Sequence, residues 1–251
     1  MFIPKSFPKQ LNSTVKSVNK CFSLLLWNIH KENQNSAFKQ TLLKLLVQHP
    51  SDFLLFQEVK YSKNTHFFLR DDFLAQYDFL LASNIEKGCH VFGVMTASKY
   101  GFKQVTPSVT CNKELGLFTH KSQLVSHHPL SNRQSLCLVN LHAINFVSNK
   151  VFNQELTHLT EQLRQFLGPM IFAGDFNTWS KSRLQQLEQC KRTLSLSSAL
   201  VAERHHIKHF FSKPLDHLLY RGLELIQAQA IDTLGISDHN PIHAHFILLP
   251  S

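Results

Sequence analysis

Short apolar runs bounded by polar clusters recur along the chain, and this pattern constrains the fold more than any other feature. Phe22–Ile29, Ser135–His142 and Met170–Gly174 are runs of this kind, largely apolar at both odd and even positions. A strand that is apolar on both faces is covered on both faces, as in parallel sheets or in sheets packed against one another. The pattern therefore predicts buried strands rather than a sheet that is open to solvent on one side.

Stretches of helical periodicity alternate with these runs. Ser36–Gln48 predicts an amphipathic helix with Ser36 as its N-cap. Together with strands at Phe22–Ile29 and Asp52–Gln57, this helix has the size of a right-handed crossover between two parallel strands. Two further helices are predicted, at Val151–Leu167 and Lys181–Cys190.

The middle and the end of the chain predict more strands. Several β-like runs between about Phe79 and Val125, such as His90–Thr96, are separated by glycine and proline, which predicts antiparallel pairing. Leu215–Tyr220 and His243–Leu249 are the last two predicted strands.

These elements together predict an α/β fold in which two mixed β-sheets pack face to face and helices cover the outer faces, a four-layer α/β sandwich. A doubly wound Rossmann fold is the weaker alternative, because Asn28-Ile29-His30-Lys31 follows the first strand where a glycine-rich phosphate loop would stand. Residues 21–251 are expected to form this single domain. Residues 1–20, which contain four lysines and no acid, are expected to form a basic, poorly ordered tail.

The charge balance favours a polyanionic partner. The sequence has 26 Lys+Arg against 17 Asp+Glu, a formal net charge of +9, which suits nucleic acid, a phosphorylated metabolite or an anionic membrane surface. Five widely spaced cysteines without a CxxC pair indicate a reducing compartment rather than a disulfide framework or a zinc knuckle. No apolar stretch approaches the ~20 residues of a transmembrane helix, and no cleavable signal is recognisable. A cytoplasmic location is therefore expected, with export by another route left open.

Polar residues able to bind a metal ion or move a proton follow the buried strands, where α/β proteins build their sites. Each alone has an ordinary explanation: a capping carboxylate for Glu58, an Asx-turn for Asp175 and Asn177, a hydrogen-bonded core histidine for His142. Jointly they predict one pocket. Oxygen ligands with little sulfur suit Mg²⁺ or Mn²⁺, and attack of water on a phosphorus ester is the reaction class that fits. The residues concerned are Asn28, Glu58, Asn140, His142, Asp175, Asn177, Asp216, Asp238 and His239.

The order of these motifs resembles the endonuclease/exonuclease/phosphatase superfamily, whose fold is DNase I-like, and in particular its YafD-type branch. The resemblance covers roughly residues 22–247 and is specific because several motifs occur in the family's order. The segments that carry it are Val139–Phe146, Ala173–Trp179, Pro214–His217, Arg221–Leu223 and Ser237–Pro241.

The resemblance implies a role for each of these residues. Glu58, with Asn28 and Asp238, would bind the metal ion. Asp175 would align or deprotonate the attacking water, Asn177 would donate a hydrogen bond to the phosphate, Asp216 would pair with His239, and His142 would act as general acid or phosphate donor. Whether Asp175 or His239 is the base stays open. The resemblance also gives four candidate substrate-binding residues, Asn28, Asn140, Asn145 and Arg221.

Three residues of the branch motifs have structural alternatives. For Trp179, packing is favoured over catalysis. Arg221 stands open between a phosphate contact and a structural ion pair. His217 is expected to be exposed or structural.

The leading functional hypothesis is a metal-dependent phosphoesterase that hydrolyses a phosphodiester by in-line attack of water, with nucleic acid as the favoured substrate. The first alternative is a phospholipid or inositol-phosphate hydrolase, whose basic tail and Phe67-Phe68 would touch a membrane. The second is a non-catalytic phosphate-binding protein with the same fold. Sequence inspection identifies no stretch of interleaved aromatic and basic residues that resembles a base-stacking platform, so substrate recognition is the weakest part of the leading hypothesis.

Overall fold

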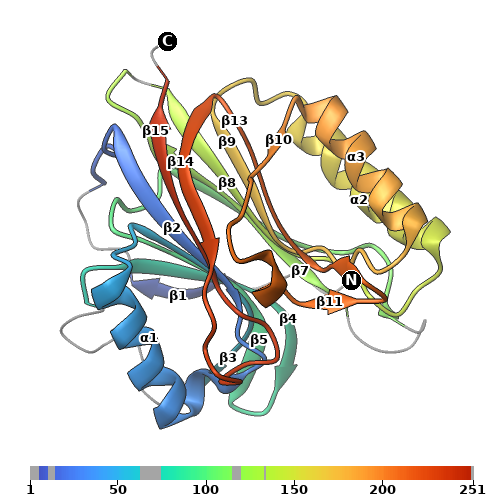
Figure 1. The fold of residues 1–251 in the computed structure, drawn as a ribbon, viewed down its shortest axis with the longest axis horizontal. Coiled ribbons are helices and arrows are strands. Elements are labelled where there is room, and N and C mark those ends of the chain that lie inside the picture. Colours follow the sequence, from blue (N-terminus) through green and yellow to red (C-terminus); the bar gives the residue numbers. More distant parts are fainter. Residues whose placement is uncertain (1–5, 11–14, 63–74, 115–119, 133, 250–251) are drawn as a thin grey trace.

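Two β-sheets packed face to face form the centre of the computed structural model (Figure 1). The structure describes residues 6–10, 15–62, 75–114, 120–132 and 134–249. Phe67 and Phe68, which the membrane hypothesis involves, lie outside the described residues.

The first sheet has seven strands in the order β1-β4-β5-β3-β2-β15-β14. Only β2 and β3 run parallel, and every other neighbouring pair is antiparallel, so the sheet is mixed. Its strands are β1 (Ser6–Gln10), β2 (Cys21–Asn28), β3 (Phe53–Ser62), β4 (Asp78–Lys87), β5 (His90–Ser98), β14 (Leu223–Ala230) and β15 (Ile242–Leu248).

The second sheet has six strands in the order β10-β13-β9-β8-β7-β6, with β8 and β9 as its parallel pair. Its strands are β6 (Gln104–Val109), β7 (Ser122–Pro129), β8 (Ser135–His142), β9 (Met170–Asp175), β10 (Ser197–Ser198) and β13 (Asp216–Arg221). A separate two-stranded hairpin consists of β11 (His209–Phe210) and β12 (Lys213–Pro214).

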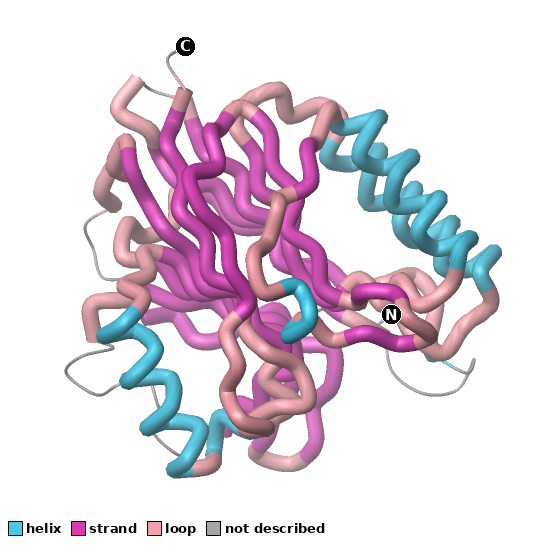
Figure 2. The backbone as a smooth tube through the Cα atoms, viewed as in Figure 1, coloured by secondary structure: helices cyan, strands magenta, loops and turns pink. Residues whose placement is uncertain are grey.

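Helices cover the two outer faces, which gives the predicted four-layer sandwich (Figure 2). Helix α1 (Ser36–Gln48) packs with β2–β5 of the first sheet in one apolar cluster, while α2 (Asn149–Leu163) and α3 (Lys181–Leu194) pack with the second sheet in another. A third cluster, which includes Leu24, Phe53 and Ile171, lies between the sheets. This double coverage explains the runs that are apolar on both faces. Two short 3-10 helices, η1 (Glu32–Gln34) and η4 (Arg204–His206), complete the structure described.

Some local predictions differ from the structure. Asn35, rather than Ser36, caps α1, because its side chain accepts a hydrogen bond from the Ala37 amide. The N-terminal segment is not simply a tail: β1 pairs with β4 as an edge strand, and the Val18 side chain is buried in the core between the sheets. A basic segment can join a sheet edge because the pairing of strands is made by backbone hydrogen bonds.

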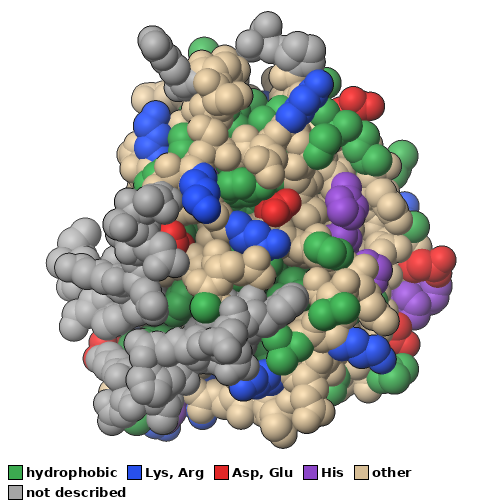
Figure 3. Space-filling view, turned by 90° about the vertical axis from the view of Figure 1, so that its left-hand side faces the viewer, with side chains coloured by type: hydrophobic (Ala, Val, Ile, Leu, Met, Phe, Trp, Pro, Cys, Tyr) green, Lys and Arg blue, Asp and Glu red, His purple; other side chains and the backbone are tan. Residues whose placement is uncertain are grey.

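Two surface features bear on the expected partners. In the described part of the chain no helix is both long enough and apolar enough to cross a bilayer. On the face drawn in Figure 3, Lys and Arg side chains are scattered and acidic side chains lie among them. The net positive charge is therefore not concentrated in one patch on that face.

Candidate active site

Seven of the predicted site residues meet at one edge of the sandwich, where the carboxyl ends of the parallel strand pairs lie. In the second sheet the register places His142, Asp175 and Asp216 side by side at the ends of β8, β9 and β13. In the first sheet Asn28, at the end of β2, is paired with Gln57. Each sheet thus supplies half of the polar side chains.

A glycine allows this edge to close. Gly174 precedes Asp175 and has φ +150, and a Cβ on it would lie 1.9 Å from the backbone oxygen of Leu141 on β8. Only glycine permits so close an approach of the two strands. Gly174 thereby sets the spacing between His142 and Asp175.

Glu58 reaches the site through a β-bulge. The pairing of β3 with β5 shifts between Phe56 and Val59, and Glu58 has the left-handed φ of 54. A bulge redirects the side chain at which it occurs. Gln57 remains fully buried while Glu58 turns toward the second sheet, where its Oε1 lies 3.8 Å from Nε2 of His142.

Asp175 is the centre of the site. Its Oδ2 accepts a hydrogen bond of 3.0 Å from Nδ2 of Asn28, and its Oδ1 accepts one of 2.9 Å from the backbone amide of Asn177. The same Oδ2 lies 3.7 Å from Nε2 of His142 and 3.8 Å from Nε2 of His239. The carboxylate therefore contacts groups from both sheets.

His239 is held in a fixed orientation by its neighbours. Nδ1 lies 2.8 Å from Oδ2 of Asp216. The loop that carries His239 is fastened to β2, because its carbonyl accepts from Nε1 of Trp27 at 2.8 Å and Ser237 Oγ donates to the carbonyl of Asn28 at 2.7 Å. The Asp216 contact makes Nδ1 the protonated nitrogen and turns Nε2 toward Asp175.

Electrostatics divide the ionisable groups into charged and neutral ones. Burial lowers the pKa of His239, but the adjacent Asp216 and Asp175 outweigh burial and raise it to about 9. Burial opposes ionisation of Glu58, yet the neighbouring His142 ring and the positive charges of Lys121 and Lys31 lower its pKa to about 2. At neutral pH His239 is therefore an imidazolium and Glu58 a carboxylate.

Two central groups are shifted toward their neutral forms. Burial raises the pKa of Asp175 above its usual range, although the positive charge of His239 opposes this shift. Burial and the nearby Lys121 hold the pKa of His142 well below its usual range. His142 is therefore a neutral imidazole between two carboxyl groups.

The structure brings together seven of the predicted residues: Asn28, Glu58, His142, Asp175, Asn177, Asp216 and His239. Asn177 follows Asp175 with a φ of 50, and its Nδ2 donates to the carbonyl of Ala143 at 3.0 Å. This contact fixes the amide beside the loop after β8.

Two predicted substrate-binding residues lie elsewhere. Asn140 is fully buried between the sheets, where its Oδ1 accepts from Gln57 and its Nδ2 donates to the Met95 carbonyl. Arg221 stands at the opposite end of β13 from Asp216, and its guanidinium donates to the carbonyls of Phe166, Gly168 and Leu194. The phosphate-contact prediction for Arg221 is wrong; its role is structural, although through backbone carbonyls rather than an ion pair.

Two others lie near the site without joining it. Asn145 Oδ1 accepts from the indole of Trp179 at 2.9 Å, which supports a structural role for both residues. Asp238 is exposed, and its Oδ2 lies 3.7 Å from Nζ of Lys208. It adds negative charge near His239 but is not among the ligand atoms that cluster around Asp175.

For His217 the prediction was an exposed or a structural residue, and its contacts are those of a structural one. Its Nε2 lies 2.7 Å from Oγ1 of Thr178, and its ring contacts Phe176.

Three basic residues at the site were not predicted from the sequence. Lys31 Nζ lies 2.8 Å from Oε2 of Glu58, and Lys121 adds positive charge there. Arg183 is buried in α3 and donates to the carbonyls of Asn177 and Asn145, so it ties together the loops after β8 and β9. The position of Lys31 soon after Asn28 is a signal that could have been used; Lys121 and Arg183 stand in no motif.

The donor set fits a hard divalent cation. Ligand atoms of Asp175, Asp216 and His239 all lie within 4.8 Å of one another, and the carboxylate of Glu58 lies on the other side of His142 from Asp175, 3.8 Å from Nε2 of this ring. The buried Oδ1 of Asp216 has no hydrogen-bond partner among the described residues. A buried oxygen without a hydrogen-bond donor is a position that a bound cation or a water molecule can satisfy.

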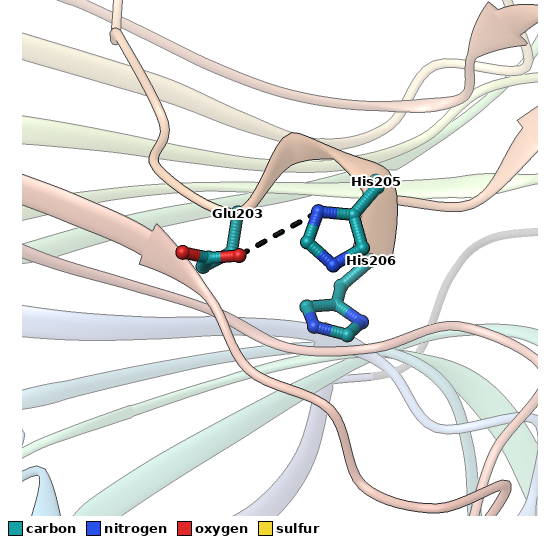
Figure 4. A group of neighbouring side chains, drawn as sticks. All are labelled: Glu203, His205 and His206. Atoms are coloured by element: carbon teal, nitrogen blue, oxygen red, sulfur yellow. Dashed lines mark ion pairs between the residues drawn. The ribbon is translucent and has the colours of Figure 1, made fainter.

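A second group of ligand-type side chains lies away from these residues. Glu203, His205 and His206 cluster on η4, with Nδ1 of His205 3.5 Å from Oε2 of Glu203 (Figure 4). Unlike the first group, these side chains are largely exposed.

Comparison with known proteins agrees with this geometry. The model of the Endonuclease/Exonuclease/phosphatase family matches residues 25–239. The chain belongs to this family. A UPF0294 protein of Vibrio parahaemolyticus is 35% identical over 227 residues, which cover 90% of this chain and 78% of the relative. The UPF0294 proteins are the YafD-type group, so the branch suggested by the motifs is also confirmed.

Solved structures of low sequence identity share the fold of this family. An endonuclease/exonuclease/phosphatase family protein from Leptotrichia buccalis superposes with a TM-score of 0.68 at 17% identity and covers 89% of this chain and 98% of that one. The human Nocturnin catalytic domain with bound sulfate anion gives 0.65 at 16% identity, covering 93% and 96%. The DNase I-like fold is therefore confirmed.

Proposed function

We propose that this protein is a phosphodiesterase that uses Mg²⁺ or Mn²⁺ and acts on nucleic acid. One observation carries the proposal: a single buried carboxylate, Asp175, contacts Asn28, His142 and His239 at once. A core residue without chemical function would not need two imidazoles and an amide around one oxygen. A non-catalytic protein would not need to preserve this arrangement.

Glu58 and Asn28 would hold the metal ion. Glu58 is ionised at any pH near neutrality, and the bulge that holds it at a φ of 54 maintains a strained backbone beside the site. When bound, the metal ion would supply positive charge to the phosphate oxygens and stabilise the charge that develops on them.

Asp175 would take the proton of the attacking water. Its pKa is raised, so it accepts a proton more readily than an ordinary aspartate. His239 carries a proton at neutral pH because its pKa is about 9, so it cannot serve as the base. The ring of His239 and the free amide hydrogen of Asn177 would instead donate hydrogen bonds to the phosphate.

His142 would complete the phosphate site as a neutral donor. Its depressed pKa keeps one ring nitrogen unprotonated at neutral pH, so it adds no charge to the imidazolium of His239. Nε2 faces both Glu58 and Asp175, and a hydrogen on this nitrogen can point to either carboxylate or to a substrate oxygen.

The test compares substrates as well as variants. Purified protein is assayed with single-stranded DNA, duplex DNA, RNA and phosphoinositide, with Mg²⁺ and Mn²⁺ titrated. We expect metal-dependent cleavage of nucleic acid and a loss of about 100- to 10,000-fold for Asp175→Asn, the range that general base catalysis contributes. Glu161→Gln, which removes an exposed carboxylate on α2, is the control. Hydrolysis of the phosphoinositide alone would refute the nucleic-acid assignment.

A further inference from the structure

One exposed segment beside the site combines aromatic, basic and imidazole side chains. Among residues 204–213 only Ile207 is buried. This segment was not identified in the sequence analysis, because its two aromatic residues are adjacent rather than interleaved with basic ones. The segment is Arg204-His205-His206-Ile207-Lys208-His209-Phe210-Phe211-Ser212-Lys213.

The end of this segment is a tight hairpin that presents two phenylalanines to solvent. His209 pairs with Pro214 and Phe210 with Lys213, so Phe211 and Ser212 form the turn. The Phe210 and Phe211 side chains are 50% and 72% exposed, and their ring centroids lie 4.4 Å apart. Two adjacent rings are thus held together without being buried by the protein.

The turn holds this aromatic pair under backbone strain. Phe211 and Ser212 have φ values of 49 and 60, a conformation that such turns normally assign to asparagine and glycine. A bulky residue at positive φ is uncommon, and strain of this kind concentrates at functional sites. The hairpin is therefore better suited to presenting Phe211 than to stabilising the fold.

Hydrogen bonds connect the hairpin to both halves of the catalytic centre. Thr178, three residues after Asp175, donates to the Pro214 carbonyl at 2.6 Å, and the Phe176 amide donates to the Leu215 carbonyl at 2.8 Å. Asn240, next to His239, donates to the His206 carbonyl at 3.2 Å. Figure 1 shows β11 and the short helix η4 close to the loop that enters β15. A molecule bound on this segment would thus lie at the rim of the site.

We propose that residues 204–213 bind single-stranded nucleic acid and guide it to the site, an inference that rests on the proposed nuclease function. Phe211, the more exposed of the two rings, stacks on a base, and Phe210, tilted by 55° to it, packs beside it. Such stacking is sequence-tolerant because every base has a π-face. Lys208, Lys213 and Arg204 contact the backbone phosphates on either side. In a duplex the bases already stack on one another, so the aromatic pair distinguishes single strands from duplexes.

The composition of the segment favours nucleic acid over a lipid surface. Three cations and three imidazoles accompany only two exposed phenylalanines, an apolar area much smaller than the face that an amphipathic membrane helix buries. The aromatic pair offers a surface for a base, and Lys208 and Lys213 lie on either side of it along the chain, where phosphates of the same strand could be bound. Glu203 adds its negative charge at the start of the segment, where it faces His205 (Figure 4).

Binding is measured without cleavage, in EDTA, by fluorescence anisotropy with a labelled single-stranded DNA of mixed sequence. Phe210→Ala/Phe211→Ala should weaken binding at least about fivefold, the lower end of the effect of losing one stacked base. Leu167→Ala is the matched control, because Leu167 is 89% exposed but lies next to the far end of β9. Phe211→Trp should retain the affinity, and its fluorescence should be quenched when the oligonucleotide binds.

Charge is tested separately. Lys213→Gln should reduce the slope of log affinity against log salt by about 0.7, the loss of one phosphate contact on a single strand. Lys44→Gln, on the exposed face of α1, should leave the slope unchanged.

The outcomes separate this proposal from the proposed activity. Bis(4-nitrophenyl) phosphate is a small substrate without bases that could stack on the segment. The decrease in kcat/KM caused by the double substitution should therefore be at least fivefold smaller on this substrate than on the oligonucleotide. If no substrate is hydrolysed but the binding loss is seen, the nuclease assignment fails and the binding segment stands. If the double variant binds oligonucleotide normally, or loses affinity only for vesicles of phosphatidylglycerol, the proposal is wrong.

Discussion

Replacing Asp216 by asparagine should remove a pH-dependent part of the folding free energy. The Asp216 and His239 side chains are both almost fully buried, and Nδ1 and Oδ2 are 2.8 Å apart. Burial alone would lower the pKa of His239, yet Asp216 and then Asp175 raise it to about 9. The imidazolium is thus more stable in the folded protein than in the unfolded chain.

The magnitude follows from linkage. A rise in the pKa from 6.5 to about 9, at about 1.4 kcal/mol per pH unit, corresponds to about 3 kcal/mol of folding free energy. Because the folded-state pKa is the higher one, this stabilisation is fully present below pH 6.5 and is lost as the pH rises through about 9. In Asp216→Asn the main partner of the imidazolium is gone while burial remains, so most of this term disappears.

Urea unfolding in EDTA at about pH 6.5, 8 and 10 measures the effect without any bound metal ion. The difference in unfolding free energy between wild type and Asp216→Asn should be larger at pH 6.5 than at pH 10 by about 3 kcal/mol. Asp238→Asn, which removes an exposed carboxylate next to the same histidine, should give a much smaller pH dependence. Equal differences between wild type and Asp216→Asn at all three pH values would refute the assignment of a charged His239 at neutral pH.

Three further substitutions test the site and its frame. Gly174→Ala should fail to fold or lose several kcal/mol of stability, because the added Cβ would lie 1.9 Å from the Leu141 oxygen. An unchanged melting temperature would contradict the close approach of β8 and β9. Glu58→Gln should raise the Mg²⁺ concentration needed for half-maximal activity and leave the melting temperature nearly unchanged, so an unaltered metal titration would remove Glu58 from the site. Arg221→Gln should lower the free energy of unfolding by about 2 kcal/mol or more with KM unchanged, since it deletes charged hydrogen bonds to carbonyls; a raised KM at constant stability would restore a substrate role.

The fold was largely predictable because its central strands are covered on both faces. Apolar runs predicted β2, β3, β8, β9, β13 and β15, and helical periodicity predicted the three α-helices, while the edge strand β14 was not predicted. Edge elements were harder to predict. β1 pairs with β4 although its sequence, Ser-Phe-Pro-Lys-Gln, is neither apolar throughout nor regularly alternating.

The sequence predicted most of the residues that form the site, but not how far each of them lies from the strand end. Asn140 and His142 lie on the same face of β8, yet a separation of two residues places Asn140 about 7 Å further from the strand end. That distance moves Asn140 from the site into the core. The same reasoning could have excluded Arg221, because five residues of extended strand separate it from Asp216 by about 16 Å. Sequence motifs thus identify which residues belong together and leave open whether each faces substrate or supports the frame.

The buried amides explain why a site divided between two sheets can hold its geometry. Apolar packing alone lets facing sheets slide, because the hydrophobic effect is not directional. Several buried hydrogen bonds cross between the sheets, among them Asn28 to Asp175 at 3.0 Å at the rim, and Gln57 to Asn140 at 2.6 Å further inside. A buried amide that loses its partner costs far more than an apolar contact that shifts. These pairs therefore fix the lateral register of the sheets, and with it the distance from Glu58 on one sheet to Asp175 on the other.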